Sequence, residues 1–326
     1  MMVSLDVLVK NIWKGVKMKL LICCLMLFVV FSIAFAESDR PITILLTVAP
    51  GVAKDVVVRS LISNSKFPIV ILNKPGAGGA IALAQLSNSK ADGYTLASGE
   101  DGSLISTSLL QPVPYKPLRD FSLIMGFAIG GRGALLVRNE SPWKTFNDFI
   151  DYTKRNPGKV TYSSAGFGMP MHLNMEIIAH KEAISWVHIP SKGSVAARAA
   201  LTSGCVDICS SGADWIYYVG KETGLRPLVS VSDTRTVGFP NVPSIKEFGY
   251  DPLLEVWNIM GPIGLSLETV KRLENMFTEL ASNQKFKIDS ERMNVTVNIM
   301  NGSKLVQYVS TEWVRREKLF RELGII

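Results

Sequence analysis

The fold is decided by the stretch Leu72-Asn73-Lys74-Pro75-Gly76-Ala77-Gly78-Gly79-Ala80-Ile81, a glycine-rich loop between a β-branched run and an apolar segment with helical spacing. Glycines lack Cβ, so the backbone of such a loop can approach a ligand closely. The helix that follows directs its free N–H groups and the positive end of its dipole toward the same place. The stretch therefore predicts a strand, a loop and a helix that bind an anion. An ordinary strand-to-helix turn without a ligand is the alternative.

Nucleotide-binding loops have a different glycine pattern. Gly76 and Gly78 lack the third glycine of the dinucleotide fingerprint, because Ile81 occupies that position. No Gly-Lys-Ser or Gly-Lys-Thr phosphate loop occurs in the chain. We therefore expect no phosphate cofactor and no other cofactor.

Strand and helix patterns alternate on both sides of this loop, which is typical of parallel α/β sheets. The first group has strands at 42–48, 68–72 and 94–98 and helices at 55–62 and 79–86. The second group has strands at 134–137, 160–163, 186–189, 206–209 and 228–231, and helices at 146–154, from Pro170 onward, and between Ser194 as N-cap and Gly204. A capping box of Ser244 and Glu247 follows, the segment 256–265 returns to the first group, and two helices are predicted to finish the chain. Ligands of such sheets bind at the carboxyl ends of the strands.

The first 36 residues have the pattern of a secretory signal peptide. Four lysines, the last of them Lys19, precede an apolar run, and Ala34-Phe35-Ala36 provides a small-x-small cleavage site. Translation from Met18 instead of Met1 would leave a more typical signal, so both starts stay open. A retained membrane anchor is the alternative, because the run approaches spanning length. Cleavage is favoured and predicts a soluble, periplasmic protein.

Charge and cysteine content exclude further classes of protein. The 326-residue chain has a formal net charge of +7, which falls to +4 when residues 1–36, with four lysines and one aspartate, are removed. Its basic residues are scattered, without the stripe that a nucleic-acid backbone requires. Cys205 and Cys209 would lie roughly 13 Å apart on an extended strand, too far for a disulfide. We expect no nucleic-acid partner, buried free thiols and no zinc site.

Six motifs occur in the order and spacing of one protein family. They are Asp55-Val56-Val57-Val58-Arg59, Asn73-Lys74-Pro75-Gly76-Ala77-Gly78-Gly79, Ala91-Asp92-Gly93-Tyr94-Thr95-Leu96, Tyr115-Lys116-Pro117-Leu118-Arg119-Asp120-Phe121, His188-Ile189-Pro190-Ser191-Lys192-Gly193-Ser194 and Asn241-Val242-Pro243-Ser244. The chain resembles the solute receptors of the tripartite tricarboxylate transporter family, also called Bug receptors, over essentially its whole mature length.

The resemblance implies a type II periplasmic binding protein, in which two Rossmann-like α/β domains are joined by two crossover segments with a ligand cleft between them. On this pattern residues 37–137 and 256–326 form domain 1, and residues 138–255 form domain 2. Members of the family bind a small carboxylate in the cleft and hand it to a membrane permease. The resemblance thus implies a receptor for a small organic carboxylate or an acidic amino acid, which we expect to be a monomer and not an enzyme.

Ligand-binding positions follow from the same pattern. They are Gly51, Val52, Ala53, Lys54, Asp55, Ala77, Gly78, Gly79 and Ser98 in domain 1, and Ser163, Gly168, His172 and Ser191 in domain 2. The hydroxyl residues that the family usually has before Asp55 are missing, and each lost donor weakens carboxylate binding by roughly 0.5–1.5 kcal/mol. Valine at 52 also resists a positive φ, so the first loop is expected to take another shape. Met169 and Met171 stand in a loop that is commonly small and polar, and Ser191 replaces a tyrosine.

Charged residues near these loops leave alternatives open. Lys54 either offsets the lost donors through its charge or points to solvent. Glu100 and Asp101 either face an amino group of the ligand or form a solvated turn. His172 shares a helix face with Glu176, but two residues do not make a metal site, so we expect His172 to cap or orient its loop.

Two functional hypotheses remain. The first is an extracytoplasmic carboxylate receptor that serves uptake. The second is a divergent receptor whose altered site acts in sensing or signalling to a membrane partner. Catalysis has little support, because the chain has no Gly-x-Ser-x-Gly nucleophile motif and only three histidines as imidazole bases.

Overall fold

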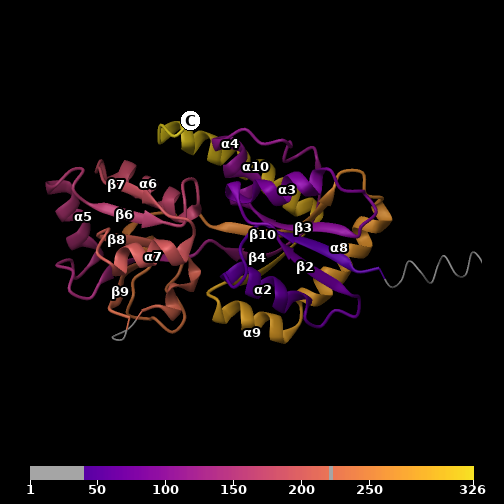
Figure 1. Cartoon of the computed structure of the whole chain (residues 1–326), viewed down its shortest axis with the longest axis horizontal. Coiled ribbons are helices and arrows are strands. Elements are labelled where there is room, and N and C mark those ends of the chain that lie inside the picture. Colours follow the sequence, from indigo (N-terminus) through magenta and orange to yellow (C-terminus); the bar gives the residue numbers. More distant parts are fainter. Residues whose placement is uncertain (1–39, 220–222) are drawn as a thin grey trace, which may run out of the picture.

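The computed structural model describes residues 40–219 and 223–326, so the predicted signal peptide lies outside the described residues. Figure 1 shows a long molecule with one sheet in each half. Within the two described ranges, no helix is both long and apolar enough to cross a membrane.

The first half contains a six-stranded sheet with the order β11-β4-β10-β3-β1-β2. Its strands are β1 Ile42–Leu46, β2 Ile69–Asn73, β3 Thr95–Glu100, β4 Phe121–Gly130, β10 Glu255–Pro262 and β11 Thr296–Asn301. The predicted parallel unit is present, since Ile44 of β1 lies opposite Ile71 of β2 and Leu96 of β3. Strand β10 is antiparallel to both β3 and β4, which brings the late chain segment into the centre of the sheet.

Helices cover both faces of this sheet, and alternate side chains of β1 divide between them. Ile44 packs in one core with Val57 and Phe277, whereas Leu45 packs in another with Leu83 and Leu305. The first face is covered by α2 Ala53–Ile62, α8 Leu267–Ala281 and α9 Gln284–Arg292, and the second by η1 Ala77–Gly79, α3 Ala80–Ser87, η2 Gly102–Ser106, α4 Thr107–Leu110 and α10 Gly302–Glu322 (Figure 1).

The second half contains a five-stranded sheet with the order β7-β6-β8-β5-β9. Its strands are β5 Gly133–Arg138, β6 Thr161–Ser164, β7 Val187–Pro190, β8 Ile208–Ser211 and β9 Leu225–Val231. It is flanked by α5 Phe146–Arg155, α6 Pro170–Glu182, α7 Ser194–Thr202, η3 Ala213–Tyr217 and η4 Ile245–Phe248. Leu135 packs with Phe149 of α5 on one face, and Leu136 packs with Leu201 of α7 on the other.

Two segments connect the sheets, Gly131-Arg132 between β4 and β5, and residues 249–254 before β10. The predicted boundary at 137 falls within β5, which pairs with β8 and β9 in the second sheet. We propose that the domains follow the sheets, with the first change of domain at 131–132.

Several local predictions can be compared with the structure. Pro170 is the first residue of α6, and Ser244 and Glu247 form the predicted capping box. Ser194 is the first helical residue of α7 and not its N-cap, since Gly193 occupies the cap position. Three helices and the strand β11 follow β10, so the prediction of two final helices is wrong.

Candidate functional site

A cavity of about 140 Å³ lies between the two sheets. Both halves and the connection Gly131-Arg132 contribute to its wall. Its lining residues are Val52, Ala53, Lys54, Gly131, Arg132, Ala165, Met169, Pro170, Met171, Ser194, Gly212, Ala213, Asp214, Glu255 and Trp257. A volume of this size suits a small molecule of a few heavy atoms rather than a nucleotide.

Three α-helices begin at this cavity. The first residues of α2, α6 and α7, namely Ala53, Pro170 and Ser194, all line it. No side chain caps any of these three helices. Their positive dipole ends therefore point into the space between the sheets, and their first-turn N–H groups have no side-chain acceptor there. Such an arrangement favours an anion.

Four of the α-helices that begin elsewhere are capped by side chains, whereas α3 and α4 are not. Thr145 caps α5, Ser266 caps α8, Asn283 caps α9 and Asn301 caps α10, each accepting a backbone N–H of the first turn. The N-cap residues at the cavity are Val52, Met169 and Gly193, whose side chains have no oxygen that could cap a helix. Residues without a capping oxygen precede these helices in the sequence, but Gly79 precedes α3 in the same way without lining the cavity, so this signal alone does not identify Met169 and Ser194 as site residues.

Asp55 shapes the first predicted loop. Its carboxylate accepts the Gly51 N–H at 2.9 Å and hydrogen bonds from Arg59 and Asn73. Burial works to raise the pKa of Asp55, but these hydrogen bonds outweigh it and hold the pKa below the ordinary value. Val52 has an extended φ of −77°, so it avoids the positive φ that valine resists. Val52, Ala53 and Lys54 line the cavity, whereas Gly51 and Asp55 lie behind it.

The glycine-rich loop that decides the fold does not line the cavity. Ala77, Gly78 and Gly79 pack instead against η2 and α4. A Cβ on Gly79 would lie 2.5 Å from Cβ of Ser103, and the Thr107 hydroxyl donates to the Gly78 carbonyl at 2.9 Å. The glycines are therefore needed here for the close approach of two segments of the first half.

The predicted residues of the second half also lie behind the cavity wall. Ser163 donates its hydroxyl hydrogen to the Ala197 carbonyl at 2.8 Å, and the Ser191 N–H donates to the Ser164 carbonyl. The Gly168 N–H donates to Nδ1 of His172 at 3.2 Å, which confirms that His172 orients its loop. Thus Ala165, Met169 and Met171 of this loop reach the cavity, and Ser163, Gly168, His172 and Ser191 do not.

Lys54 is buried, which contradicts the interpretation that it points to solvent. Its ammonium group forms an ion pair with Glu100 and donates to the Ser98 carbonyl and the Thr47 hydroxyl, each at 3.0 Å. Ser98 thus contributes its backbone to this network and not to the cavity wall. Burial lowers the pKa of Lys54, against the opposing effect of the Glu255 carboxylate.

Glu100 and Asp101 are buried as well, so the solvated turn is also wrong. β3 continues through Glu100, two residues beyond its predicted end. Asp101 accepts hydrogen bonds from the Tyr308 hydroxyl and the Val256 N–H and pairs with the fully buried Arg316 at 3.4 Å. Because Lys54 and Arg316 already neutralise them, neither carboxylate is available to a ligand amino group.

Glu255 is a residue of the cavity wall that the sequence did not reveal. It is the first residue of β10, it is 6% exposed, and its Oε1 has no hydrogen-bond partner among the described residues. Burial raises the pKa of Glu255 to about 7, although the charge of Arg316 opposes the shift. The other charged residues of the wall are paired, Arg132 with Asp233 at 2.9 Å and Asp214 with Arg198 at 2.9 Å.

His172 stacks on His188 behind the second-domain loop, with ring centroids 4.3 Å apart. Burial lowers the pKa of His172 from 6.5 to about 4, and the neighbouring His188 adds to the shift. Burial also lowers the pKa of His188 to about 4. Both rings are therefore neutral at pH 7, and the stack is stable only in that form.

We expect the protein to lose stability in acid because of His172. Its folded-state pKa lies below its unfolded value, so the unfolded chain takes up the proton first. Above about pH 6.5 the free energy of unfolding contains the full contribution of neutral His172. This free energy decreases by about 2–3 kcal/mol as the pH falls to about 4. Urea unfolding at several pH values should show a flatter profile for His172→Asn than for His180→Gln, an exposed position on the same helix. Equal slopes for the two variants would contradict this assignment.

The cysteines differ in exposure. Cys209 is a buried free thiol as predicted, but Cys205 is free and exposed, so the prediction that both are buried is wrong. Burial raises the pKa of Cys209 to about 11. Nowhere in the described part of the chain do three or more histidine, cysteine or acidic residues gather as a metal would require.

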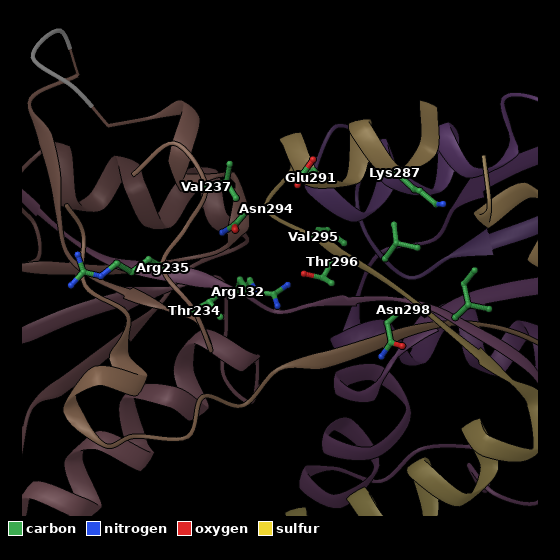
Figure 2. Close-up of a pocket in the computed structure, with 12 residues that line it drawn as sticks. Arg132, Thr234, Arg235, Val237, Lys287, Glu291, Asn294, Val295, Thr296 and Asn298 are labelled. Atoms are coloured by element: carbon green, nitrogen blue, oxygen red, sulfur yellow. The ribbon is translucent and has the colours of Figure 1, made fainter. Parts of the chain in front are cut away.

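A larger cavity of about 550 Å³ lies on another side of the junction. Figure 2 shows Thr234 and Arg235 of the second half across from Lys287 and Glu291 of α9. No α-helix begins at the wall of this larger cavity. Arg235 already forms an ion pair with Glu247 at 2.7 Å. The smaller cavity is therefore the better candidate, because it combines converging helix N-termini with buried charge.

Comparisons with known proteins agree with this architecture. The family model described as "Tripartite tricarboxylate transporter family receptor" matches residues 55–325. A Cupriavidus necator protein, "UPF0065 protein in gbd 5'region", is 30% identical over 302 residues, which cover 90% of this chain and 91% of that protein.

Solved structures show the same fold. The periplasmic binding protein BugD is 23% identical and superposes with a TM-score of 0.78, covering 88% of this chain and 98% of its own. MatC of Rhodopseudomonas palustris, solved with bound malate, is 23% identical with a TM-score of 0.74, covering 86% of this chain and 98% of its own. These likenesses confirm the predicted periplasmic binding protein fold of the chain.

Proposed function

This chain belongs to the tripartite tricarboxylate transporter receptor family, and from this membership we propose that it binds a small carboxylate in the cavity between its two sheets. Members of the family are solute-binding receptors, so the protein is not an enzyme. The observation that carries the proposal is the convergence of three uncapped helix N-termini, of α2, α6 and α7, on one cavity. Backbone N–H groups held in this way bind an anion without requiring a basic side chain.

The arrangement of the two halves supports a receptor that closes around its ligand. The first connection touches the cavity through Gly131, and Glu255, which directly follows the second connection, also lines it, so a change of angle between the halves changes the shape of the site. Across the junction, the hydroxyl group of Tyr217 of η3 donates to the Arg292 carbonyl of α9 at 2.7 Å. Hinge closure of this kind is a common response of binding proteins to their ligands.

We also propose that the receptor works outside the cytoplasm. Residues 1–36 would direct export to the periplasm, where the receptor, as a monomer, hands its ligand to membrane permease subunits. The signal-peptide pattern and the family support this part of the proposal. The ligand is a small organic carboxylate, among which acidic amino acids are included.

The first test is a binding screen of the purified protein by thermal shift and calorimetry against mono-, di- and tricarboxylates and acidic amino acids. A ligand that binds only the folded state raises the melting temperature, so saturable binding of one class without turnover is the expected result. No binding by any carboxylate would contradict the uptake receptor and favour the sensing alternative.

Ala53→Pro tests the role of the backbone N–H groups directly. Proline is tolerated at the first position of a helix, and the extended Val52 before it suits a following proline. The variant lacks one N–H at the cavity, so we expect the affinity for the carboxylate to fall by about 10–100-fold. Leu267→Pro is the matched control, since Leu267 is the 89% exposed first residue of α8 and does not line the cavity. Unchanged affinity in a folded Ala53→Pro protein would show that α2 does not hold the carboxylate.

A further inference from the structure

We infer that the ligand of this cavity carries a cationic amine as well as a carboxylate, and that Glu255 is the residue that selects the amine. The inference rests on the proposed function, because it assigns the second end of the same ligand. The acidic residues first considered for this role, Glu100 and Asp101, are neutralised by Lys54 and Arg316.

Two glycines leave room for the Glu255 side chain at the cavity wall. The side chain starts from the first residue of β10, directly after the second connection between the sheets, and passes over two glycines. A Cβ on Gly102 would lie 2.3 Å from Oε1, and a Cβ on Gly131 would lie 3.1 Å from Cγ. Larger residues at either place would displace the side chain. The carboxylate is thereby held more than nine-tenths buried at the cavity wall, with Oε1 unpartnered among the described residues.

The buried charges around Glu255 include one more carboxylate than cations. In the buried cluster behind the cavity, Glu100 pairs with Lys54, Asp101 pairs with Arg316, and Glu312 pairs with Arg315 and Arg316. Within the described ranges, Glu255 forms no ion pair. The cluster therefore lacks one positive charge. The Glu255 carboxylate is stabilised by the Gly102 backbone N–H and by the charges of Arg316 and Lys54, but no cation contacts it, which is unfavourable for a buried carboxylate. Without a ligand a proton can fill this role, as the raised pKa of Glu255 indicates.

A ligand ammonium group would supply the missing charge. Trp257 lines the wall two residues along β10, and Met169 and Met171 line it from the second half. An indole ring and thioethers are polarisable surfaces that suit an alkylammonium group. The helix N-termini attract the carboxylate end, so the two charges of a compact zwitterion would find complementary partners within one cavity.

The test uses pairs of acids that differ only in an ammonium group and its carbon equivalent. Suitable pairs are glycine betaine with 3,3-dimethylbutanoate, 4-aminobutyrate with pentanoate, and L-glutamate with 2-methylglutarate. Calorimetry at pH 8, where Glu255 is ionised, is expected to show at least one pair in which the ammonium compound binds about tenfold or more tightly. In Glu255→Gln this preference should disappear, while the carbon equivalent binds as before.

The same variant has a second readout that needs no ligand. Removing an unbalanced buried charge should raise the melting temperature of the free protein at pH 8, by several degrees. Glu279→Gln, on the exposed side of α8, is the control and should change neither the preference nor the melting temperature.

Three outcomes are distinguishable. Loss of the ammonium preference in Glu255→Gln supports the inference. Equal or tighter binding of the carbon equivalents by the unchanged protein, or a preference that survives in Glu255→Gln, overturns the inference and leaves the carboxylate receptor intact. Failure of every acid in both sets to bind overturns both proposals.

Discussion

Replacement of Arg316 by methionine is expected to reduce the free energy of unfolding by about 3–5 kcal/mol. Arg316 lies on α10, is fully buried, and donates to Asp101, to the Ser106 hydroxyl at 2.8 Å and to the Leu254 carbonyl at 3.0 Å. Methionine preserves the apolar stem but leaves the Asp101 carboxylate without its cation in the interior. The loss of that partner, more than the loss of the pair's own attraction, makes the change costly.

Urea unfolding measures this effect, with Arg321→Met as the control. Arg321 is on the same helix and pairs with Glu317 at the surface, with its side chain 65% exposed, so its removal should cost less than about 1 kcal/mol. The double variant Arg316→Met, Asp101→Asn should lose less free energy of unfolding than the two single variants lose in sum, since Asp101 then leaves no carboxylate without a cation. Similar losses for Arg316→Met and Arg321→Met would contradict the account of the buried cluster.

Lys54→Met is expected to have an effect of the same size, about 3–5 kcal/mol. The change leaves the buried Glu100 carboxyl group without its cation, close to the other carboxylates of the cluster. Lys54→Met, Glu100→Gln removes both charges, so we expect it to recover most of the lost stability. Chemical unfolding of the single and double variants forms a double-mutant cycle that reports the coupling between the two residues.

Lys318→Met is the surface control for this cycle, because Lys318 is 77% exposed and pairs with Glu322 only at 3.7 Å. Its removal should change stability by less than about 1 kcal/mol. If the double variant were as unstable as Lys54→Met alone, Lys54 would have a role other than neutralising Glu100. The carboxylate affinity of the variant Lys54→Met, Glu100→Gln then shows whether the charge of Lys54 also attracts the ligand.

Much of the fold was predictable because its signals are local. β-Branched runs predicted β1 and β2, and Pro170 predicted the start of α6. Ser244 and Glu247 predicted a capping box. The return of the chain to the first group at 256–265 was predicted, whereas the central place of β10 in the sheet was not. The predictions were less successful where an element depends on its neighbours. The edge strand β11 has a mixed pattern and pairs only with β4, so its sequence alone does not distinguish it from a loop.

The site was predicted only in part. From the first loop, Val52, Ala53 and Lys54 line the candidate cavity. The glycine loop at 76–79 has the composition of a ligand-binding loop, yet its glycines serve packing against Ser103 and Thr107. Close approach of backbone to backbone and close approach of backbone to a ligand require the same residue, so composition cannot separate the two uses.

By itself, the sequence determined most of the elements, their alternation and the family, because each depends on residues that are near one another in the chain. Only the tertiary structure decided which charges are paired. Lys54 meets Glu100 across 46 residues and Arg316 meets Asp101 across 215, and these contacts leave Glu255 as the carboxylate without a cation at the cavity. Ion pairing depends on distance and burial in space, which the order of residues along the chain does not state.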